Sequence, residues 1–235
     1  MERLDKVISH MNGSSRREVR EMVRQGRVTV GGAVVLDAET KVDNAAQIRI
    51  DGKILTVEEN TYLMLHKPSG ILTATEDRKQ KTVLDLLAPE YRNRGLSPVG
   101  RLDIDTEGLL LLTNDGELNH RLTSPKYQID KVYEAEVEGI LTQEDKEAFA
   151  AGIPLKDFTC LPAKLEILAE NRCLVTVQEG KFHQVKRMLQ SRGQPVRYLK
   201  RWSVGPIKLP VDLTKGNYRP LTKEEIETLR VVCRL

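Results

Sequence analysis

The 235-residue sequence contains no apolar run approaching the roughly 18 residues that a membrane-spanning helix requires. Cysteine is scarce, and Cys160, Cys173 and Cys233 are irregularly spaced without a CxxC pair, so neither a disulfide framework nor a zinc site is indicated. We expect core thiols instead. A dinucleotide-binding fingerprint, a P-loop and a metal-ligand cluster are also missing, so no such motif indicates a nucleotide cofactor or a metal site. The net charge of +3 is too small to indicate a polyanionic partner unless the charges are clustered.

The residues that are present are typical of a globular protein. Hydrophobic residues make up 40% and charged residues 30% of a chain long enough for one large domain, or for a small and a medium domain. The first residues, MERLDKVISH, lack the apolar stretch of a secretory signal. A cytoplasmic location, no membrane association and a monomeric state are expected.

The first 50 residues predict two short helices and a small sheet. Apolar residues recur at helical spacing over residues 4–11, and a second helix begins at a capping box of Ser15 with Glu18 and ends at Gly26. Gly31-Gly32 is typical of a hairpin turn. Short strands are expected near residues 28–30, 34–35 and 48–50.

Arginines are concentrated on the second helix. Residues 14–27 hold five Arg and only two Glu, whereas residues 1–60 balance ten Lys or Arg against ten Asp or Glu. A basic helix face is often merely solvated, but the sorting of positive charge onto one element favours RNA phosphate as a partner. The residues expected to contact RNA here are Arg16, Arg17, Arg20, Arg24 and Arg27.

An α+β pattern follows residues 51–60, which look like a linker. Alternation and apolar runs predict strands for YLMLH (62–66), LLLLT (109–113), KLEIL (164–168) and CLVTVQE (173–179). A short helix is expected for DKEAFAAG (145–152).

The segment EGKFHQVKRM, residues 179–188, is strongly basic. If a helix begins near His183, Val185, Met188 and Leu189 form its buried stripe, Arg187 points away and Lys186 borders the stripe. Residues 181–208 contain eight Lys or Arg and no Asp or Glu, interleaved with aromatic residues, a composition suited to phosphates and stacked bases.

Two aspartates precede the four-leucine strand. Asp103 and Asp105 lie in a turn-rich segment, and Asn114-Asp115-Gly116 predicts a hairpin turn at the end of that strand. Carboxylates at a strand entrance serve chemistry, cap a turn or bind a metal as a DxD pair, and nothing local distinguishes the two.

Tyrosine and lysine complete the set of candidates. KVYEAEVEG alternates so that Tyr133 faces inward, as a core residue or as the wall of a pocket. In HKPSG, Lys67 follows a predicted strand and is either functional or simply exposed.

Residues 2–50 resemble the small RNA-binding domain named after ribosomal protein S-four, in which the second helix and the following hairpin carry basic RNA contacts. The order HKPSG, GRLDIDTEGLLLLTNDG, KVY and EGKFHQVKRM is similar to that of pseudouridine synthases. Specifically, essentially the whole chain resembles the small-subunit ribosomal RNA pseudouridine synthase A family.

This resemblance implies an α+β fold in two domains. A small N-terminal α+β RNA-binding domain (1–55) and a linker (56–60) would precede a larger α+β catalytic domain (61–235) with a mainly antiparallel mixed sheet. The implied activity isomerises a specific uridine in 16S ribosomal RNA, in a partly assembled small subunit, without a cofactor.

The resemblance also implies roles for individual residues. Asp103 would be the catalytic carboxylate, and Asp105 would not; Tyr133 would stack on the target base, and Lys186 would pair with Asp103. Further RNA contacts are expected from Lys67, Arg101, Lys181, His183, Arg187, Lys200 and Arg201.

Three other functions stay open at this point. Related enzymes modify 23S ribosomal RNA with the same motifs, although FHQVKRM and the ending KGNYRPLTKEEIETL favour the small-subunit branch. A non-catalytic RNA-binding ribosome-assembly protein is a second alternative. A metal-dependent nuclease or phosphotransferase, which would use Asp103 and Asp105 equally, is the third.

Overall fold

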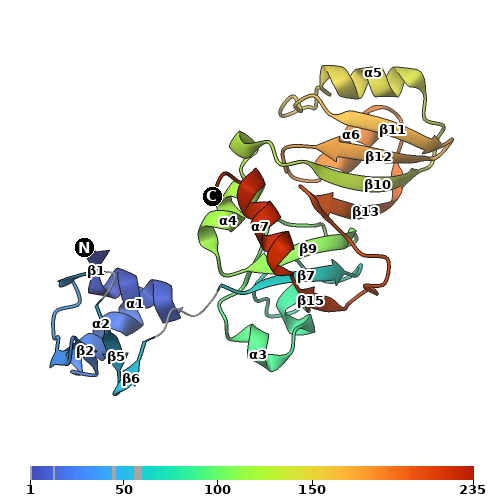
Figure 1. Ribbon diagram of the computed structural model, residues 1–235. Coiled ribbons are helices and arrows are strands. Elements are labelled where there is room, and N and C mark those ends of the chain that lie inside the picture. Colours follow the sequence, from blue (N-terminus) through green and yellow to red (C-terminus); the bar gives the residue numbers. More distant parts are fainter. Residues whose placement is uncertain (1, 13, 44–45, 56–59) are drawn as a thin grey trace. The chain divides into compact units, whose positions relative to one another are not determined.

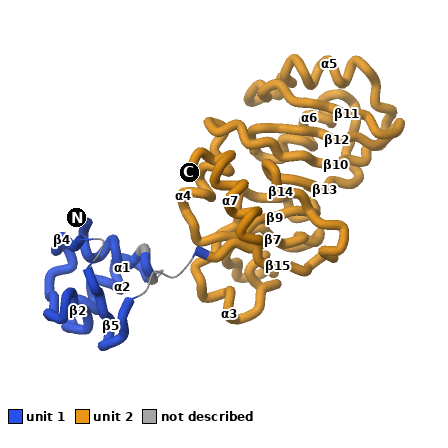
Figure 2. Tube along the Cα trace, viewed as in Figure 1, with its two compact units in different colours: residues 1–60 blue, residues 61–235 orange. Residues whose placement is uncertain are grey.

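The computed structural model describes residues 2–12, 14–43, 46–55 and 60–235. Its chain divides into two compact units, residues 1–60 and 61–235 (Figure 2). Most of the expected linker 56–60 lies outside the described residues, which include only Asn60 of that segment.

The first unit contains two helices and short strands. Ser15 and Glu18 form the predicted capping box, and Gly31 and Gly32 turn the β2–β3 hairpin with φ of +57° and +88°, a conformation that glycine adopts without strain. The elements are β1 (Glu2–Arg3), α1 (Leu4–Asn12), α2 (Arg16–Arg24), β2 (Val28–Val30), β3 (Ala33–Val34), β4 (Lys41–Val42), β5 (Ile48–Ile50) and β6 (Lys53–Ile54).

The core of this unit lies between the helices and the sheet. Leu4 and Ile8 of α1 and Val19 and Val23 of α2 are fully buried in it. The four-stranded sheet has the order β3-β2-β5-β6. The expectation that residues 51–60 form a linker is wrong for its first part, because Lys53–Ile54 pairs with β5 and belongs to this sheet.

The second unit is built on a nine-stranded sheet (Figure 1). Its main order is β11-β12-β10-β13-β9-β7-β15, with β8 and β14 paired at the side. The strands are β7 (Tyr62–Lys67), β8 (Ser97–Pro98), β9 (Glu107–Thr113), β10 (Lys131–Val137), β11 (Lys164–Ala169), β12 (Arg172–Val177), β13 (Val196–Val204), β14 (Ile207–Lys208) and β15 (Tyr218–Pro220).

Helices and helical turns connect these strands and cover the sheet. They are η1 (Val83–Leu86), α3 (Pro89–Arg92), α4 (Gly116–Thr123), η2 (Pro125–Tyr127), α5 (Gln143–Ala151), α6 (Gln184–Ser191) and α7 (Lys223–Val232). In strand β9, Leu110 and Leu112 pack into one core cluster with α6, whereas Leu109 and Leu111 pack into another with α4 and α7. Both faces of the four-leucine strand are therefore buried.

The two halves of the sheet meet where β9 and β13 run side by side in parallel. Among the strand pairs described, this pair alone is parallel, so the expectation of a mainly antiparallel mixed sheet is confirmed. Gly108 lies opposite Arg201 with φ of +109°, and a Cβ atom there would lie 2.3 Å from the Arg201 carbonyl oxygen. Only glycine permits this approach of the two backbones.

The predicted hairpin turn at Asn114-Asp115-Gly116 is wrong. Asp115 caps helix α4 instead, and its Oδ1 accepts a hydrogen bond of 3.0 Å from the Leu118 amide. Leu118 and Leu122, four residues apart, bury one face of that helix. Hairpin turns and helix N-caps favour the same residue types. Here the amphipathic pattern after Gly116 makes the segment a helix and not a turn.

Cys160, Cys173 and Cys233 are buried, as predicted for core thiols. Among the described residues, no helix combines the length and the apolar character needed to cross a membrane.

Candidate active site

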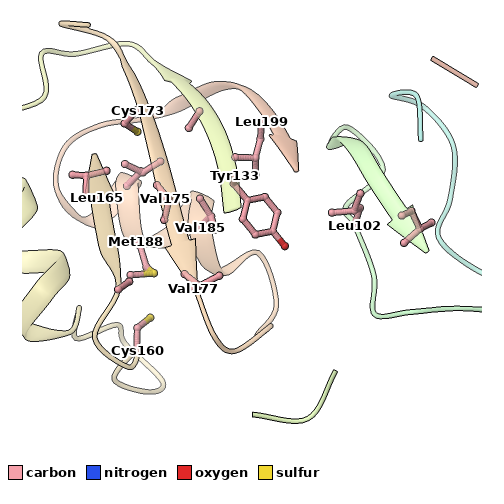
Figure 3. Packing of buried hydrophobic residues seen from close by; sticks show 14 of the residues in the cluster. Leu102, Tyr133, Cys160, Leu165, Cys173, Val175, Val177, Val185, Met188 and Leu199 are labelled. Carbon is pink, nitrogen blue, oxygen red and sulfur yellow. The ribbon is translucent and has the colours of Figure 1, made fainter. Parts of the chain in front are cut away.

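A pocket opens in the second unit, between strand β10, helix α6 and the loop before β9. Apolar side chains form part of its wall, and Figure 3 shows the Tyr133 ring projecting from β10 toward Leu102. The polar residues that line it include Arg101, Asp103, Thr106, Glu179, Lys181, His183 and Lys186. All of these belong to the motifs that carry the resemblance, or lie next to them.

The buried side chain of Lys67 holds the loop that carries Asp103 through hydrogen bonds to its backbone. Lys67 Nζ donates to the carbonyl oxygens of Pro68 (3.1 Å), Asp103 (3.1 Å), Ile104 (3.2 Å) and Thr106 (2.9 Å). Three of these acceptors belong to residues 103–106. The end of strand β7 thus fixes the backbone of the aspartate loop.

The expectation that Lys67 contacts RNA is wrong. Its side chain is 0% exposed, so no phosphate can reach the ammonium. Burial lowers the pKa of Lys67 to about 8, while the charges of Asp105 and Asp103 act in the opposite direction. Lys67 therefore acts inside the fold, where its ammonium donates to backbone carbonyls of the aspartate loop.

Two further hydrogen bonds hold the same loop from the segment after β7. Thr73 Oγ1 donates to the Leu102 carbonyl at 2.8 Å and accepts from its amide at 3.3 Å. The Gly70 amide donates to the Ile104 carbonyl at 2.8 Å. Asp103 therefore lies between two backbone positions that are both fixed.

The opposite wall depends on a buried glutamate. Glu179 is 3% exposed and accepts from the Leu161 amide at 2.9 Å and from Gln184 Nε2 at 2.8 Å. Gln184 Oε1 in turn accepts from the Lys181 amide at 3.0 Å. These bonds shape residues 179–184 into the bend that starts helix α6, with His183 in the left-handed conformation at φ +49°.

Lys186, on helix α6, connects the wall formed by residues 179–184 to the loop that carries Asp103. Its Nζ lies 3.2 Å from Asp103 Oδ2, which is the predicted pairing, and 2.5 Å from Asp105 Oδ1. The hydrogen bond from Lys186 lowers the pKa of Asp105. Sequence reasoning missed this second partner, because the DxD spacing alone does not show that both carboxylates turn toward one cation.

The two aspartates differ in exposure. The side chain of Asp103 is 24% exposed and that of Asp105 is 65% exposed. Asp103 also lies 3.5 Å from His183 Nε2. Asp103 is thus the carboxylate inside the pocket, and Asp105 holds Lys186 from the solvent side.

Tyr133 and Arg201 form a buried pair behind the pocket. Tyr133 is 9% exposed, and Arg201 Nη1 donates to its hydroxyl at 3.4 Å. Arg201 Nε donates to the Leu109 carbonyl at 2.8 Å. The expectation that Arg201 contacts RNA is wrong, because the residue is 2% exposed and connects β9 to the tyrosine.

Most of the other cations expected to bind RNA have acidic partners. In the first unit Arg20 pairs with Asp5, Arg24 with Glu21 and Arg27 with Asp51, whereas Arg16 and Arg17 are exposed on α2. In the second unit Arg101 is exposed at the pocket, Lys181 pairs with Glu179, Arg187 with Asp157, and Lys200 lies over the Trp202 ring. Of the eight basic residues of 181–208, five pair with carboxylates outside that segment, namely Lys181, Lys186, Arg187, Arg192 and Arg197.

No group of three or more potential His, Cys, Asp or Glu metal ligands occurs within the described ranges. Between Asp103 and Asp105 the chain supplies its own cation, Lys186.

Comparison with known proteins shows the family to which the chain belongs. Residues 61–191 match the family described as RNA pseudouridylate synthase, and residues 2–48 match the S4 domain. The chain belongs to the RNA pseudouridylate synthase family. It is accordingly an isomerase with an N-terminal S4 domain.

Full-length relatives in this family are similar to the chain. Ribosomal small subunit pseudouridine synthase A of Escherichia coli (strain K12) is 40% identical over 97% of this chain and 99% of the relative. Ribosomal large subunit pseudouridine synthase B of Bacillus subtilis (strain 168) is 39% identical over 99% of this chain and 97% of the relative. A crystal structure of a pseudouridylate synthase, 37% identical, covers 97% of this chain and 100% of its own, with a TM-score of 0.71.

Proposed function

We propose that this pseudouridine synthase converts a specific uridine of 16S ribosomal RNA in the cytoplasm, and that Asp103 is its catalytic carboxylate. The observation that carries the proposal is the pocket in which Asp103, Lys186 and Tyr133 converge from three separate segments of the chain. The isomerisation breaks the bond between N1 and C1′, forms the bond between C5 and C1′, and moves a proton from C5 to N1. It consumes no redox equivalent and no nucleotide.

Asp103 acts at the ribose in this proposal. Whether it attacks as a nucleophile or removes a proton as a base, it must be ionised. The ammonium of Lys186, 3.2 Å from Oδ2, holds the carboxylate in a fixed orientation. Asp105 has no chemical step and holds Lys186 in place.

Tyr133 receives the uracil ring. A uridine within structured RNA must leave its stack to reach the pocket, at a cost of a few kcal/mol, and stacking on an aromatic ring offsets part of that cost. The hydrogen bond from Arg201 to the hydroxyl fixes the orientation of the ring.

The S4 domain supplies RNA affinity outside the pocket. Arg16 and Arg17, exposed on α2, are proposed to contact backbone phosphates. Arg20, Arg24 and Arg27 contribute less in this proposal, because each already has a carboxylate partner.

The choice of 16S RNA rests on two segments of the sequence. Overall identity is 40% to the small-subunit relative and 39% to the large-subunit relative, so the choice is made on local segments. The proposal follows the segments FHQVKRM and KGNYRPLTKEEIETL, which resemble the small-subunit branch.

A direct assay separates the two substrates. Purified protein is incubated with 16S transcripts, 23S transcripts and partly assembled small subunits, and pseudouridine is mapped by chemical labelling and primer extension. Product at one position of 16S RNA, higher in the partly assembled subunit, is expected. Product in 23S RNA alone would assign the large-subunit substrate instead, and binding without product would leave a ribosome-assembly protein.

A further inference from the structure

Two stacked rings lie at the edge of the catalytic pocket. Phe182 and His183 follow strand β12 and precede helix α6, and their ring centroids are 3.8 Å apart with an interplanar angle of 20°. His183 Nε2 lies 3.5 Å from Asp103 Oδ1, which places the pair beside the proposed reacting carboxylate. The stack is therefore within reach of any RNA whose uridine enters the pocket.

Phe182 is 69% exposed although it is a large apolar side chain. Its contact with the His183 imidazole is nearly parallel, so that contact covers one face of the ring and leaves the other available to solvent. Offset parallel stacking is also the geometry in which aromatic side chains bind nucleobases. The exposed ring thus has the form of a stacking surface.

The charges around the stack favour a base over a phosphate as its ligand. Lys186 is paired with Asp103 and Asp105, Arg187 with Asp157, and Lys181 with Glu179. Because each of these three cations already has a carboxylate partner, its attraction for a further anion is reduced. Stacking does not depend on net charge, so it is available at this edge beside the paired cations.

We propose that the Phe182–His183 stack binds the nucleobase adjacent to the target uridine. This inference rests on the proposed function, because it requires the uridine to occupy the pocket beside Asp103. When that uridine leaves the helix, its neighbour loses a stacking partner. The open face of Phe182 replaces it and so stabilises the extruded state.

The test pairs ring substitutions with removal of the base. Phe182→Tyr keeps an aromatic ring, and Phe182→Leu keeps an apolar side chain without one. Short RNAs containing the uridine mapped in the wild-type reaction are made intact, and with an abasic nucleotide on its 5′ or its 3′ side. Kd is measured by fluorescence anisotropy, and the isomerisation rate is measured in single turnovers at saturating protein.

The expected pattern is a coupling between one ring and one base. Phe182→Leu should raise Kd for intact RNA about 5- to 50-fold, whereas Phe182→Tyr should stay within about twofold of wild type. One of the two abasic RNAs should bind wild type as weakly as intact RNA binds Phe182→Leu. With that abasic RNA, Phe182→Leu should raise Kd no further. The saturating rate should change less than about threefold.

Other results would overturn the proposal in distinguishable ways. If wild type forms pseudouridine but Phe182→Leu binds intact RNA as tightly as wild type, the stacking role is refuted and the proposed function stands. Independent, multiplying losses from Phe182→Leu and from both abasic RNAs would also refute it. If no ribosomal RNA gives product, the proposed function fails and the stacking proposal fails with it.

Discussion

Replacing Lys67 by methionine should destabilise the second unit and misplace the catalytic loop. The substitution keeps the length of the side chain and removes its ammonium. That ammonium donates to four carbonyl oxygens, three of them in residues 103–106, and its side chain is 0% exposed. After the substitution these carbonyls have no donor at Lys67.

Lys131→Met is the matched control. Lys131 is also buried, at 6% exposure, and burial also lowers its pKa to about 8, but among the described residues its Nζ donates to the Ile129 carbonyl alone. Both substitutions remove a buried charge, so the difference between them isolates the carbonyl bonds. An ammonium has three N–H donors, so Lys67 makes about two more full bonds than Lys131.

The magnitude follows from these bonds. Hydrogen bonds to charged groups contribute about 1.5–3 kcal/mol each, so at the lower end of this range Lys67→Met should lower the free energy of unfolding by about 3 kcal/mol more than Lys131→Met. For a unit of this size that difference corresponds to about 6–12 °C in Tm. A displacement of Asp103 by about 1 Å should also lower the single-turnover rate about 100-fold, whereas Lys131→Met should stay within about threefold.

Urea unfolding with constant slope, followed by single-turnover pseudouridine formation below the transition, measures both effects. Equal stabilities for the two methionine variants would refute the role of Lys67 as the anchor of the loop. So would a Lys67→Met enzyme with an unchanged rate.

Four further predictions follow from other contacts. Gly108→Ala should cost more than about 3 kcal/mol or prevent folding, because its Cβ would lie 2.3 Å from the Arg201 carbonyl oxygen, while Gly116→Ala, with open space around it, should be close to neutral in urea unfolding. Arg201→Met should lower the saturating isomerisation rate of the wild-type enzyme but should lower the rate of Tyr133→Phe little further, because that variant lacks the hydroxyl that Arg201 contacts. Additive losses of rate would argue against that contact. The double variant Arg16→Gln, Arg17→Gln should reduce the slope of log Kd against log salt concentration by about 1.5. The double variant Arg24→Gln, Arg27→Gln should reduce that slope less, because both arginines already pair with carboxylates. Equal reductions would contradict the proposal that Arg16 and Arg17 make the main phosphate contacts of the S4 domain. The pKa of Asp105 is lowered in the folded state by the hydrogen bond from Lys186, so the stability it contributes is present above pH about 4 and is lost as the pH falls further; Asp105→Asn should flatten the stability curve in that acidic range, and an unchanged curve would contradict the pairing.

Local patterns predicted much of the fold. The capping box at Ser15, the Gly31-Gly32 turn and the alternation around Tyr133 depend on neighbouring residues, so the sequence alone contains their cause. The same holds for helix α6, whose buried stripe of Val185, Met188 and Leu189 was expected. Asp115 was misread because a helix cap and a turn use the same residue, and the decision depends on what packs against Leu118.

The candidate site was less predictable where it depends on contacts between distant segments. Lys67 and Arg201 were expected to contact RNA, yet each is buried where backbone carbonyls are available as acceptors. The second partner of Lys186, Asp105, and the buried Glu179 behind helix α6 likewise depend on how the walls of the pocket meet. No local sequence signal contains that information.

The measurement that tests the central claim most directly compares Asp103→Asn with Asp105→Asn. Both remove one carboxylate that contacts Lys186, at 3.2 Å and 2.5 Å respectively. With 16S RNA in partly assembled subunits and EDTA present, Asp103→Asn should form no detectable pseudouridine, whereas Asp105→Asn should keep activity within about tenfold of wild type. Activity in Asp103→Asn, or equal loss in both variants, would contradict the assignment of Asp103 as the catalytic carboxylate.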